Sequence, residues 1–233
     1  MSPGYRTFGI LLACLGIAPA VEAQQPFPPQ EESLRYSVNW PSGLSLGEAV
    51  LTAHHAGGGW ELDLSLDANV PGFAIADHFH STTNGDSCSQ VFERDTRHGS
   101  KKAQEKTLFD YPAAMGHRTT MNGGTSDFPI PPHCASDALA FLYSARRALA
   151  HGSIPPPAEI YFGSSYSLRM EYTGEQSIQI SDKPATTDRV AVSLKGPASS
   201  STFEMFFARD AARTPLLVKI PVAVGTISLE LAR

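Results

Sequence analysis

Residues Pro131 to Gly152 read Pro-Pro-His-Cys-Ala-Ser-Asp, then Ala-Leu-Ala-Phe-Leu-Tyr-Ser-Ala-Arg-Arg-Ala-Leu-Ala, then His-Gly. Alanine and leucine favour helix, Ser136 or Asp137 can cap the first turn, and Gly152 can end the last turn. The stretch therefore predicts one amphipathic helix over about residues 136–150. The apolar residues that recur at helical spacing are Ala138, Leu139, Phe141, Leu142, Ala145 and Leu149.

The rest of the chain alternates apolar and polar residues with period two, which is typical of half-buried β strands. The clearest run places Leu62, Leu64 and Leu66 on one face. The segment from Ser201 to Ala208 is apolar on both faces, which predicts a central strand covered on both sides, with the helix on one of them. The helix residues that we expect to pack near this strand are Ala138, Leu142, Ala145 and Leu149.

About a dozen short strands at hairpin spacing, with no alternation of strands and helices, predict a mainly β protein. The architecture that fits is a single antiparallel domain over residues 34–233, built as a curved sheet or a barrel-like one with one packed α-helix. Residues 115–132 carry several Gly and Pro residues and few apolar ones, so we expect a long connection there. Pro221 within a strand indicates an edge or a bulge, so the sequence is compatible with a closed sheet and with an open one.

The first 23 residues have the features of a secretory signal peptide: one positive residue, a short apolar run and the ending Val21-Glu22-Ala23. The apolar run is too short to span a bilayer, so we expect no membrane span. Cleavage after Ala23 leaves residues 24–33 as a flexible leader rich in Pro and Gln. We expect a periplasmic or secreted protein without a lipid on Cys14, because the apolar run continues past that residue.

The net charge of −5 is mild, and it stays −5 after cleavage because Arg6 and Glu22 cancel. This charge gives no reason to expect nucleic acid as a partner. The chain has three cysteines, of which the mature chain keeps Cys88 and Cys134. In an exported chain this pair predicts one disulfide, and two unpaired buried thiols are the alternative.

Several residues form an ordered set along the chain: an early Tyr-x-Val strand, a Gly-led second strand, a helix with Asp, Leu, Tyr and Arg, a Gly-Glu pair, and a late Asp, basic residue and Pro. The residues in these places are Tyr36, Val38, Gly47, Asp137, Leu139, Tyr143, Arg146, Gly174, Glu175, Asp210, Arg213 and Pro215. This order resembles a family of exported bacterial proteins known as domain of unknown function 3108. The resemblance implies an exported, envelope-associated β protein without an established activity. The chain departs from the family at Ala140, where a Ser is usual, and at Asp182-Lys183-Pro184, which replace a Gly-bearing hairpin.

Five residues of this set are candidates for a ligand site or a family motif: Asp137, Tyr143, Arg146, Asp210 and Arg213. Asp137 places a negative charge at the start of the helix and Arg146 a positive charge near its end, as the helix dipole favours. Helix termination and a salt bridge to the sheet therefore explain these two residues without a ligand. Asp210 and Arg213 fall between two strands, where turn formation is the ordinary explanation. We expect no catalytic residue and no cofactor.

His78 and His80 are two residues apart, so on a strand both face the same side. Two imidazoles are the beginning of a zinc or copper site, but such a site needs three or four ligands. The alternation places Ala74, Ala76 and Thr82 beside them, so it supplies no third ligand. We therefore predict no metal, with His78 and His80 as weak candidates.

Three functions remain. The first is an exported, non-catalytic β protein that binds an amphiphilic or glycan component of the cell envelope, or assists envelope assembly. The second is a metal-dependent or hydrolytic periplasmic enzyme that uses His78 and His80. The third is a structural interaction domain with a solid core. The first requires an envelope lipid or glycan as ligand, and the oligomeric state is left undetermined.

Overall fold

The structure, a computed structural model, describes residues 31–70, 72–223 and 225–232, together with Met1. The predicted signal peptide from residue 2 onward, and the predicted leader up to residue 30, lie outside the described residues. Among the described residues a single helix, α1 (Ala138–Ala150), is combined with fifteen strands. The strands are β1 (Glu31–Asn39), β2 (Ser45–Ala56), β3 (Gly59–Val70), β4 (Phe73–Thr83), β5 (Ser89–His98), β6 (Lys101–Asp110), β7 (Met115–Thr120), β8 (Thr125–Pro129), β9 (Ser136–Asp137), β10 (Ala158–Tyr161), β11 (Ser165–Ile180), β12 (Lys183–Lys195), β13 (Ser200–Ala208), β14 (Pro215–Val222) and β15 (Gly225–Leu231).

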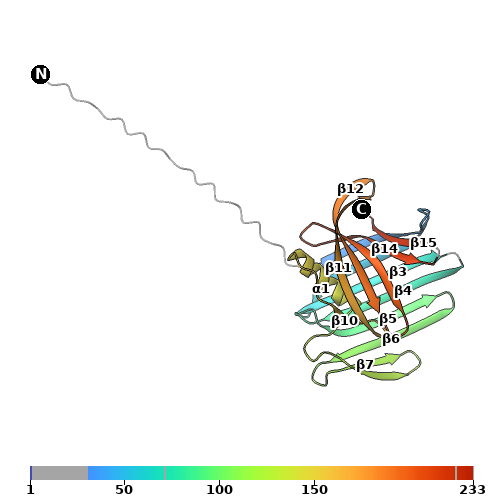
Figure 1. Ribbon diagram of the computed structural model, residues 1–233. Coiled ribbons are helices and arrows are strands. Elements are labelled where there is room, and N and C mark those ends of the chain that lie inside the picture. The colour runs from blue at the N-terminus through green and yellow to red at the C-terminus, as the bar shows by residue number, and fades with distance from the viewer. Residues whose placement is uncertain (2–30, 71, 224, 233) are drawn as a thin grey trace.

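These strands form one sheet in the order β8-β7-β6-β5-β4-β3-β2-β1-β15-β14-β13-β12-β11-β10-β9. Among the described strands the two end strands, β8 and β9, do not pair with each other, so the sheet is open. Figure 1 shows the orange and red strands β11–β14 crossing the cyan and green strands β3–β7, so the sheet curves until its two halves face each other. The predicted mainly β, curved-sheet architecture with one helix is confirmed.

The first and last strands of the described chain lie at the middle of the sheet. β1 pairs with β2 on one side and with β15 on the other, where Tyr36 lies opposite Leu231 and Val38 opposite Leu229. Beyond β15, the backbone N–H of Ala232 donates to the carbonyl of Arg35 at 2.8 Å. The chain therefore closes on itself in the interior of the sheet and not at an edge.

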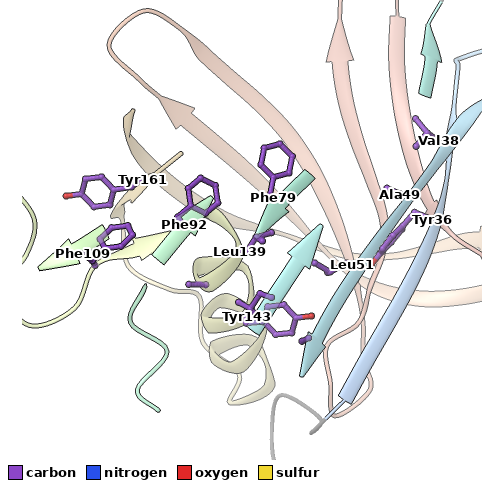
Figure 2. Packing of buried hydrophobic residues seen from close by; sticks show 14 of the residues in the cluster. Tyr36, Val38, Ala49, Leu51, Phe79, Phe92, Phe109, Leu139, Tyr143 and Tyr161 are labelled. Atoms are coloured by element: carbon purple, nitrogen blue, oxygen red, sulfur yellow. The ribbon is translucent and has the colours of Figure 1, made fainter. Parts of the chain in front are cut away.

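The helix α1 fills the space between the two halves of the sheet. Leu139 and Tyr143 belong to a buried apolar cluster with side chains of β1–β6, and Figure 2 shows them beside the strands that carry Leu51 and Phe79. The opposite side of α1 contacts β10–β13. Because both sides of the helix are buried, the interior of the curved sheet is occupied by the helix itself.

The predicted packing of α1 near the strand of residues 201–208 is confirmed. Ala145 and Leu149 share a buried cluster with Met205 and Phe207, and the partly buried helix residues Ala138 and Leu142 pack against this cluster. One face of β13 and one side of the helix therefore belong to the same buried cluster.

The second face of β13 is covered as well. Phe206, which is 1% exposed, belongs to a separate cluster with Ile178 and Ile180 from the end of β11 and with Leu216 and Leu217. The backbone N–H of Ser181, in the β11–β12 turn, donates to the carboxylate of Glu230 at 3.3 Å. The β11–β12 hairpin therefore folds over β13 to β15, and β13 is covered on both sides as predicted.

Two predicted boundaries are wrong. The connection predicted over residues 115–132 contains β7 and β8, because its glycines do not all belong to loops. Gly116 lies in β7 under the ring of Phe128, where a Cβ would be 2.3 Å from Phe128 Cζ. At the N-terminus β1 begins at Glu31, so residues 31–33 are strand and not leader.

Candidate functional site

One buried carboxylate fixes the first turn of α1. Asp137 is the N-cap, and its Oδ1 accepts hydrogen bonds from the backbone N–H groups of Leu139 at 2.8 Å and Ala140 at 3.1 Å. Its Oδ2 accepts hydrogen bonds from the hydroxyls of Ser81 at 2.5 Å and Ser89 at 2.6 Å. Asp137 thus ties the helix to β4 and β5.

The environment of Asp137 favours a structural role. Burial raises the pKa of Asp137, and the hydrogen bonds from Ser81, Ser89 and the helix backbone act against that rise. The residue is 0% exposed, and both carboxylate oxygens are already occupied by donors from the protein. A ligand would have to displace these contacts, so Asp137 serves the fold.

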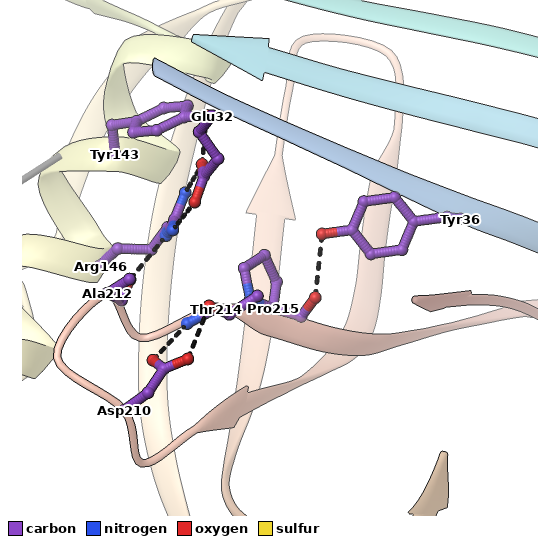
Figure 3. A network of polar contacts seen from close by, with 8 residues as sticks. All are labelled: Glu32, Tyr36, Tyr143, Arg146, Asp210, Ala212, Thr214 and Pro215. Carbon is purple, nitrogen blue, oxygen red and sulfur yellow. Dashed lines mark hydrogen bonds and ion pairs between the residues drawn. The ribbon is translucent and has the colours of Figure 1, made fainter. Parts of the chain in front are cut away.

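The second half of α1 carries a buried ion pair (Figure 3). Nη1 and Nη2 of Arg146 donate to the two carboxylate oxygens of Glu32 at 2.6 and 2.7 Å. The hydroxyl of Tyr143 donates to Glu32 Oε2 at 2.8 Å, and Nε of Arg146 donates to the carbonyl of Ala212 at 3.0 Å. The pair therefore joins α1, β1 and the turn between β13 and β14.

The charges of this pair are shielded from solvent. The side chain of Arg146 is 0% exposed and that of Glu32 is 7% exposed. Burial raises the pKa of Tyr143, and the carboxylate of Glu32 raises it further. Burial lowers the pKa of Arg146, but the hydrogen bonds and charge of Glu32 outweigh burial and raise it. Arg146 is therefore charged and Tyr143 neutral at neutral pH. The ion pair of Arg146 and Glu32 links α1 to β1 and is shielded from solvent.

Asp210 and Arg213 lie in the turn between β13 and β14, where the sequence places them. The carboxylate of Asp210 accepts hydrogen bonds from the backbone N–H of Thr214 at 3.0 Å and from its hydroxyl at 2.8 Å, which stabilises the turn. Arg213, at φ +47°, donates to the carboxylate of Asp188 at 2.5 Å. Both residues are held by contacts within the fold.

The five candidate residues do not form one site. Arg146 contacts the turn of Asp210 and Arg213 at the backbone carbonyl of Ala212, and Asp137 lies at the other end of α1. The structure therefore places the five residues in separate sets of contacts, one at the start of α1 and the others near its second half.

His78 and His80 both lie against one carboxylate on the neighbouring strand. Asp63 Oδ1 is 3.3 Å from Nε2 of His78 and 2.8 Å from Nδ1 of His80. Across residues 31–70, 72–223 and 225–232, no group of three or more His, Cys, Asp or Glu side chains is arranged to hold a metal ion. Alternation along β4 alone does not reveal that His78 and His80 contact Asp63 on the neighbouring strand β3.

The predicted disulfide between Cys88 and Cys134 is confirmed. It joins the segment before β5 to the segment before α1, with Cα atoms 5.0 Å apart. Beside it the backbone N–H of Ser89 donates to the carbonyl of Ala135 at 2.9 Å. The covalent bond and the hydrogen bond together fix the start of the helix segment on β5.

A pocket of about 250 Å³ lies between strands β6–β8 and the loop that joins β10 to β11. Its lining combines two aromatic rings with hydroxyls, one guanidinium and the carboxylate of Asp127. The lining residues that bear on its chemistry are Arg118, Ser126, Phe128, Tyr161, Ser164 and Ser165.

The β10–β11 loop is held against the sheet on both sides of this pocket. The ring of Phe162 packs on Phe79 and Phe92, with centroids 4.9 and 5.6 Å apart. The ring of Tyr161 stacks on Phe128 at 5.0 Å, and burial raises the pKa of Tyr161 to about 12, with a further contribution from Glu159. The walls of the pocket are therefore integral to the packed structure, as in preformed binding sites.

Sequence reasoning missed the residues that matter most at these places. Glu32, the partner of Arg146, falls in the segment assigned to the leader. Phe128 falls in the segment assigned to a connection, and Tyr161 ends a strand whose inward residues the alternation leaves undefined. An aromatic side chain within a segment rich in Gly and Pro is the one signal that points to this pocket.

The fold defines the class first: a β-barrel-like protein in which one open, curved sheet surrounds a single helix. A similar solved structure is the β-barrel-like protein of domain of unknown function DUF1849 from Brucella abortus, with a TM-score of 0.62 and 7% sequence identity. The match covers 86% of this chain and 95% of that chain, and at this identity it shows the fold alone.

The family is shown by sequence. The model described as "Protein of unknown function (DUF3108)" matches residues 35–232, and the chain belongs to this family, as the ordered residue set predicts. A comparison with curated proteins found no match. Within the stretches of chain that the structure describes, no helix is long and apolar enough to cross a membrane.

Proposed function

We propose that this protein is exported and binds, without catalysis, an amphiphilic or glycan component of the cell envelope in the pocket between β6–β8 and the β10–β11 loop. The observation that carries the proposal is the lining of this pocket. The Phe128 and Tyr161 rings offer an apolar wall, while Arg118, Ser164 and Ser165 offer polar groups on the other sides.

The size of the pocket limits what it can hold. Its volume of about 250 Å³ is below the range of roughly 300–1,000 Å³ that is typical for drug-sized ligands. A single sugar ring or a lipid headgroup fits such a volume. An acyl chain inside the sheet is disfavoured because α1 fills the space between the two halves.

The second candidate is a structural interaction domain with a solid core. The burial of both sides of α1 favours it, because a helix that is packed on both sides leaves no cavity for a ligand beneath it. The two candidates differ in what they predict for the pocket at the β10–β11 loop, which only the first requires.

Thermal melts of the purified protein, with and without envelope glycan fragments and dispersed envelope lipids, test the proposal. A ligand that binds only the folded state raises the melting temperature with concentration. Ser164→Trp, at an exposed residue of the lining, fills the pocket and should abolish the shift. Ser177→Trp, at an exposed residue of β11 outside the lining, is the matched control and should keep it. No shift with either class of ligand would leave the structural candidate standing.

A further inference from the structure

One lining residue of the pocket, Arg118, belongs to a small cluster of charged side chains. Arg94 on β5 and Arg118 on β7 flank Glu105 on β6, and both guanidinium groups form ion pairs with this one carboxylate. The side chain of Glu105 is 7% exposed, whereas those of Arg94 and Arg118 are 25% and 32% exposed. Within this arginine cluster, Arg94, Glu105 and Arg118, two positive charges stand against one negative charge, and Arg118 is the member that lines the pocket.

The β10–β11 loop covers the cluster closely. The carbonyl of Gly163 accepts a hydrogen bond from Nη1 of Arg118. A Cβ at Gly163 would lie 2.7 Å from Arg94 Nη1 and 2.9 Å from Glu105 Oε1, so only glycine lets the loop approach this far. The cover reduces contact with water, and the excess charge is screened less than at an open surface.

Hydrogen-bond donors of the cluster are left over. Arg118 donates from Nε to the hydroxyl of Ser126 at 3.1 Å and from Nη1 to Gly163, while its Nη2 donates to none of the described residues. Nε of Arg94 is buried and has no hydrogen-bond partner within the described residues. Of the two residues only Arg118 lines the pocket, so a ligand there that supplies an acceptor to Arg118 Nη2 gains a charge-assisted hydrogen bond.

The carboxylates on the rim define where an anion can lie. Asp127 lines the pocket and is paired with Nδ1 of His117 at 2.8 Å, and Glu159 accepts a hydrogen bond from the hydroxyl of Ser165. These two negative groups repel an anion from the rim. The favourable position is therefore at Arg118, the positively charged residue of the lining.

We propose that the pocket binds an anionic group, a carboxylate or a phosphate ester, attached to a sugar ring. The guanidinium of Arg118 binds the anion, and the ring lies against Phe128. This inference rests on the proposed function and adds to it the charge of the ligand. The same anionic group on a lipid headgroup has the same chemistry, so the experiment includes both sources.

Affinities for glucuronate, glucose 6-phosphate and glucose, measured by calorimetry on the wild-type protein, test the charge of the ligand. Phosphatidylglycerol vesicles test the lipid source. We expect the anionic sugars, or the vesicles if the lipid is the source, to bind at least about tenfold more tightly than glucose, because hydrogen bonds to charged groups are worth roughly 1.5–3 kcal/mol. Added salt should weaken this binding.

Two variants test the place of the anion. Arg118→Gln should weaken binding of the anionic ligand at least about tenfold, whereas Arg97→Gln, at an exposed arginine outside the lining, should leave it unchanged. Because Arg118 also holds the β10–β11 loop, Ser164→Glu serves as a second variant that leaves these hydrogen bonds intact. Ser164→Glu should abolish anion binding by charge repulsion, and Ser164→Gln should retain it.

The outcomes separate the two levels of the proposal. Glucose that binds as tightly as its anionic counterparts, with binding unaffected by Ser164→Glu, would overturn the charge assignment and leave the proposed function in place. If none of the neutral or anionic ligands binds, the proposed function fails together with this inference.

Discussion

The buried pair of Arg146 and Glu32 gives the sharpest stability prediction. Its two hydrogen bonds are 2.6 and 2.7 Å long, and both side chains are nearly inaccessible to solvent. Glu32→Ala removes the carboxylate that accepts two hydrogen bonds from the buried guanidinium of Arg146. Breaking a buried pair in this way costs about 3–5 kcal/mol, so we expect the free energy of unfolding to fall by that amount.

The chain offers a matched control in an exposed ion pair between β1 and the neighbouring strand β2. Arg35 and Glu48 form an ion pair of 2.7 Å, but their side chains are 59% and 57% exposed. Glu48→Ala should cost no more than about 1 kcal/mol, because water screens the exposed pair and solvates the arginine that remains. The two variants therefore compare a buried ion pair with an exposed one at nearly the same N···O distance.

Urea denaturation of both variants, and of the apolar double variant Glu32→Leu with Arg146→Met, provides the measurement. The double variant should cost less than the sum of its two single changes by at least about 2 kcal/mol, since two apolar side chains leave no uncompensated charge. Equal costs for Glu32→Ala and Glu48→Ala would refute the reasoning that burial makes this pair important.

Three further predictions concern the helix and its attachment. Removing the disulfide by replacing Cys88 and Cys134 with Ser should cost about 4 kcal/mol in a urea melt, from the loop-closure entropy of a sequence separation of 46, and the denatured, unreduced wild type should show no free thiol. Leu142→Ala, at a residue that packs against both main clusters, should cost roughly 2–5 kcal/mol in thermal or urea melts; a negligible cost would argue against a filled interior. Because the pKa of Asp137 is raised in the folded state, its favourable contribution is complete below the unfolded pKa of about 4 and is lost as pH rises through the folded pKa. The stability of wild type relative to Asp137→Asn should therefore decline between acidic and neutral pH, and a constant difference across urea melts would count against the shift.

The helix was predictable because its signals are local. Spacing of apolar residues, a capping residue and a terminal glycine all lie within one stretch of chain, and α1 begins after Asp137 as these signals indicate. The central position of β13 was predictable for the same reason, since Phe206 and Phe207 are neighbours that must face opposite sides.

The pocket at the β10–β11 loop was not predictable, because its walls come from distant segments whose contacts no local pattern records. Gly116 reads as a loop residue until the ring of Phe128 is placed above it, and no local pattern shows that the loop residue Gly163 lies against the arginine cluster. Glu32 likewise follows a Pro- and Gln-rich segment, and only the pairing of β1 with β2 shows that it belongs to the sheet.

The pairing of β1 with β15 makes the order of synthesis matter for folding. Tyr36 and Leu231, which lie opposite each other, are 195 positions apart, so the middle ladder of the sheet has to wait until the last strand is available. Contacts of such high sequence separation slow folding and leave incomplete chains with unpaired strands. A chain that stops before residue 225 would lack β15 altogether, and the vacant place would expose the edges of both β1 and β14 to other chains. β15, which is only seven residues long, is therefore needed to pair the edges of both β1 and β14.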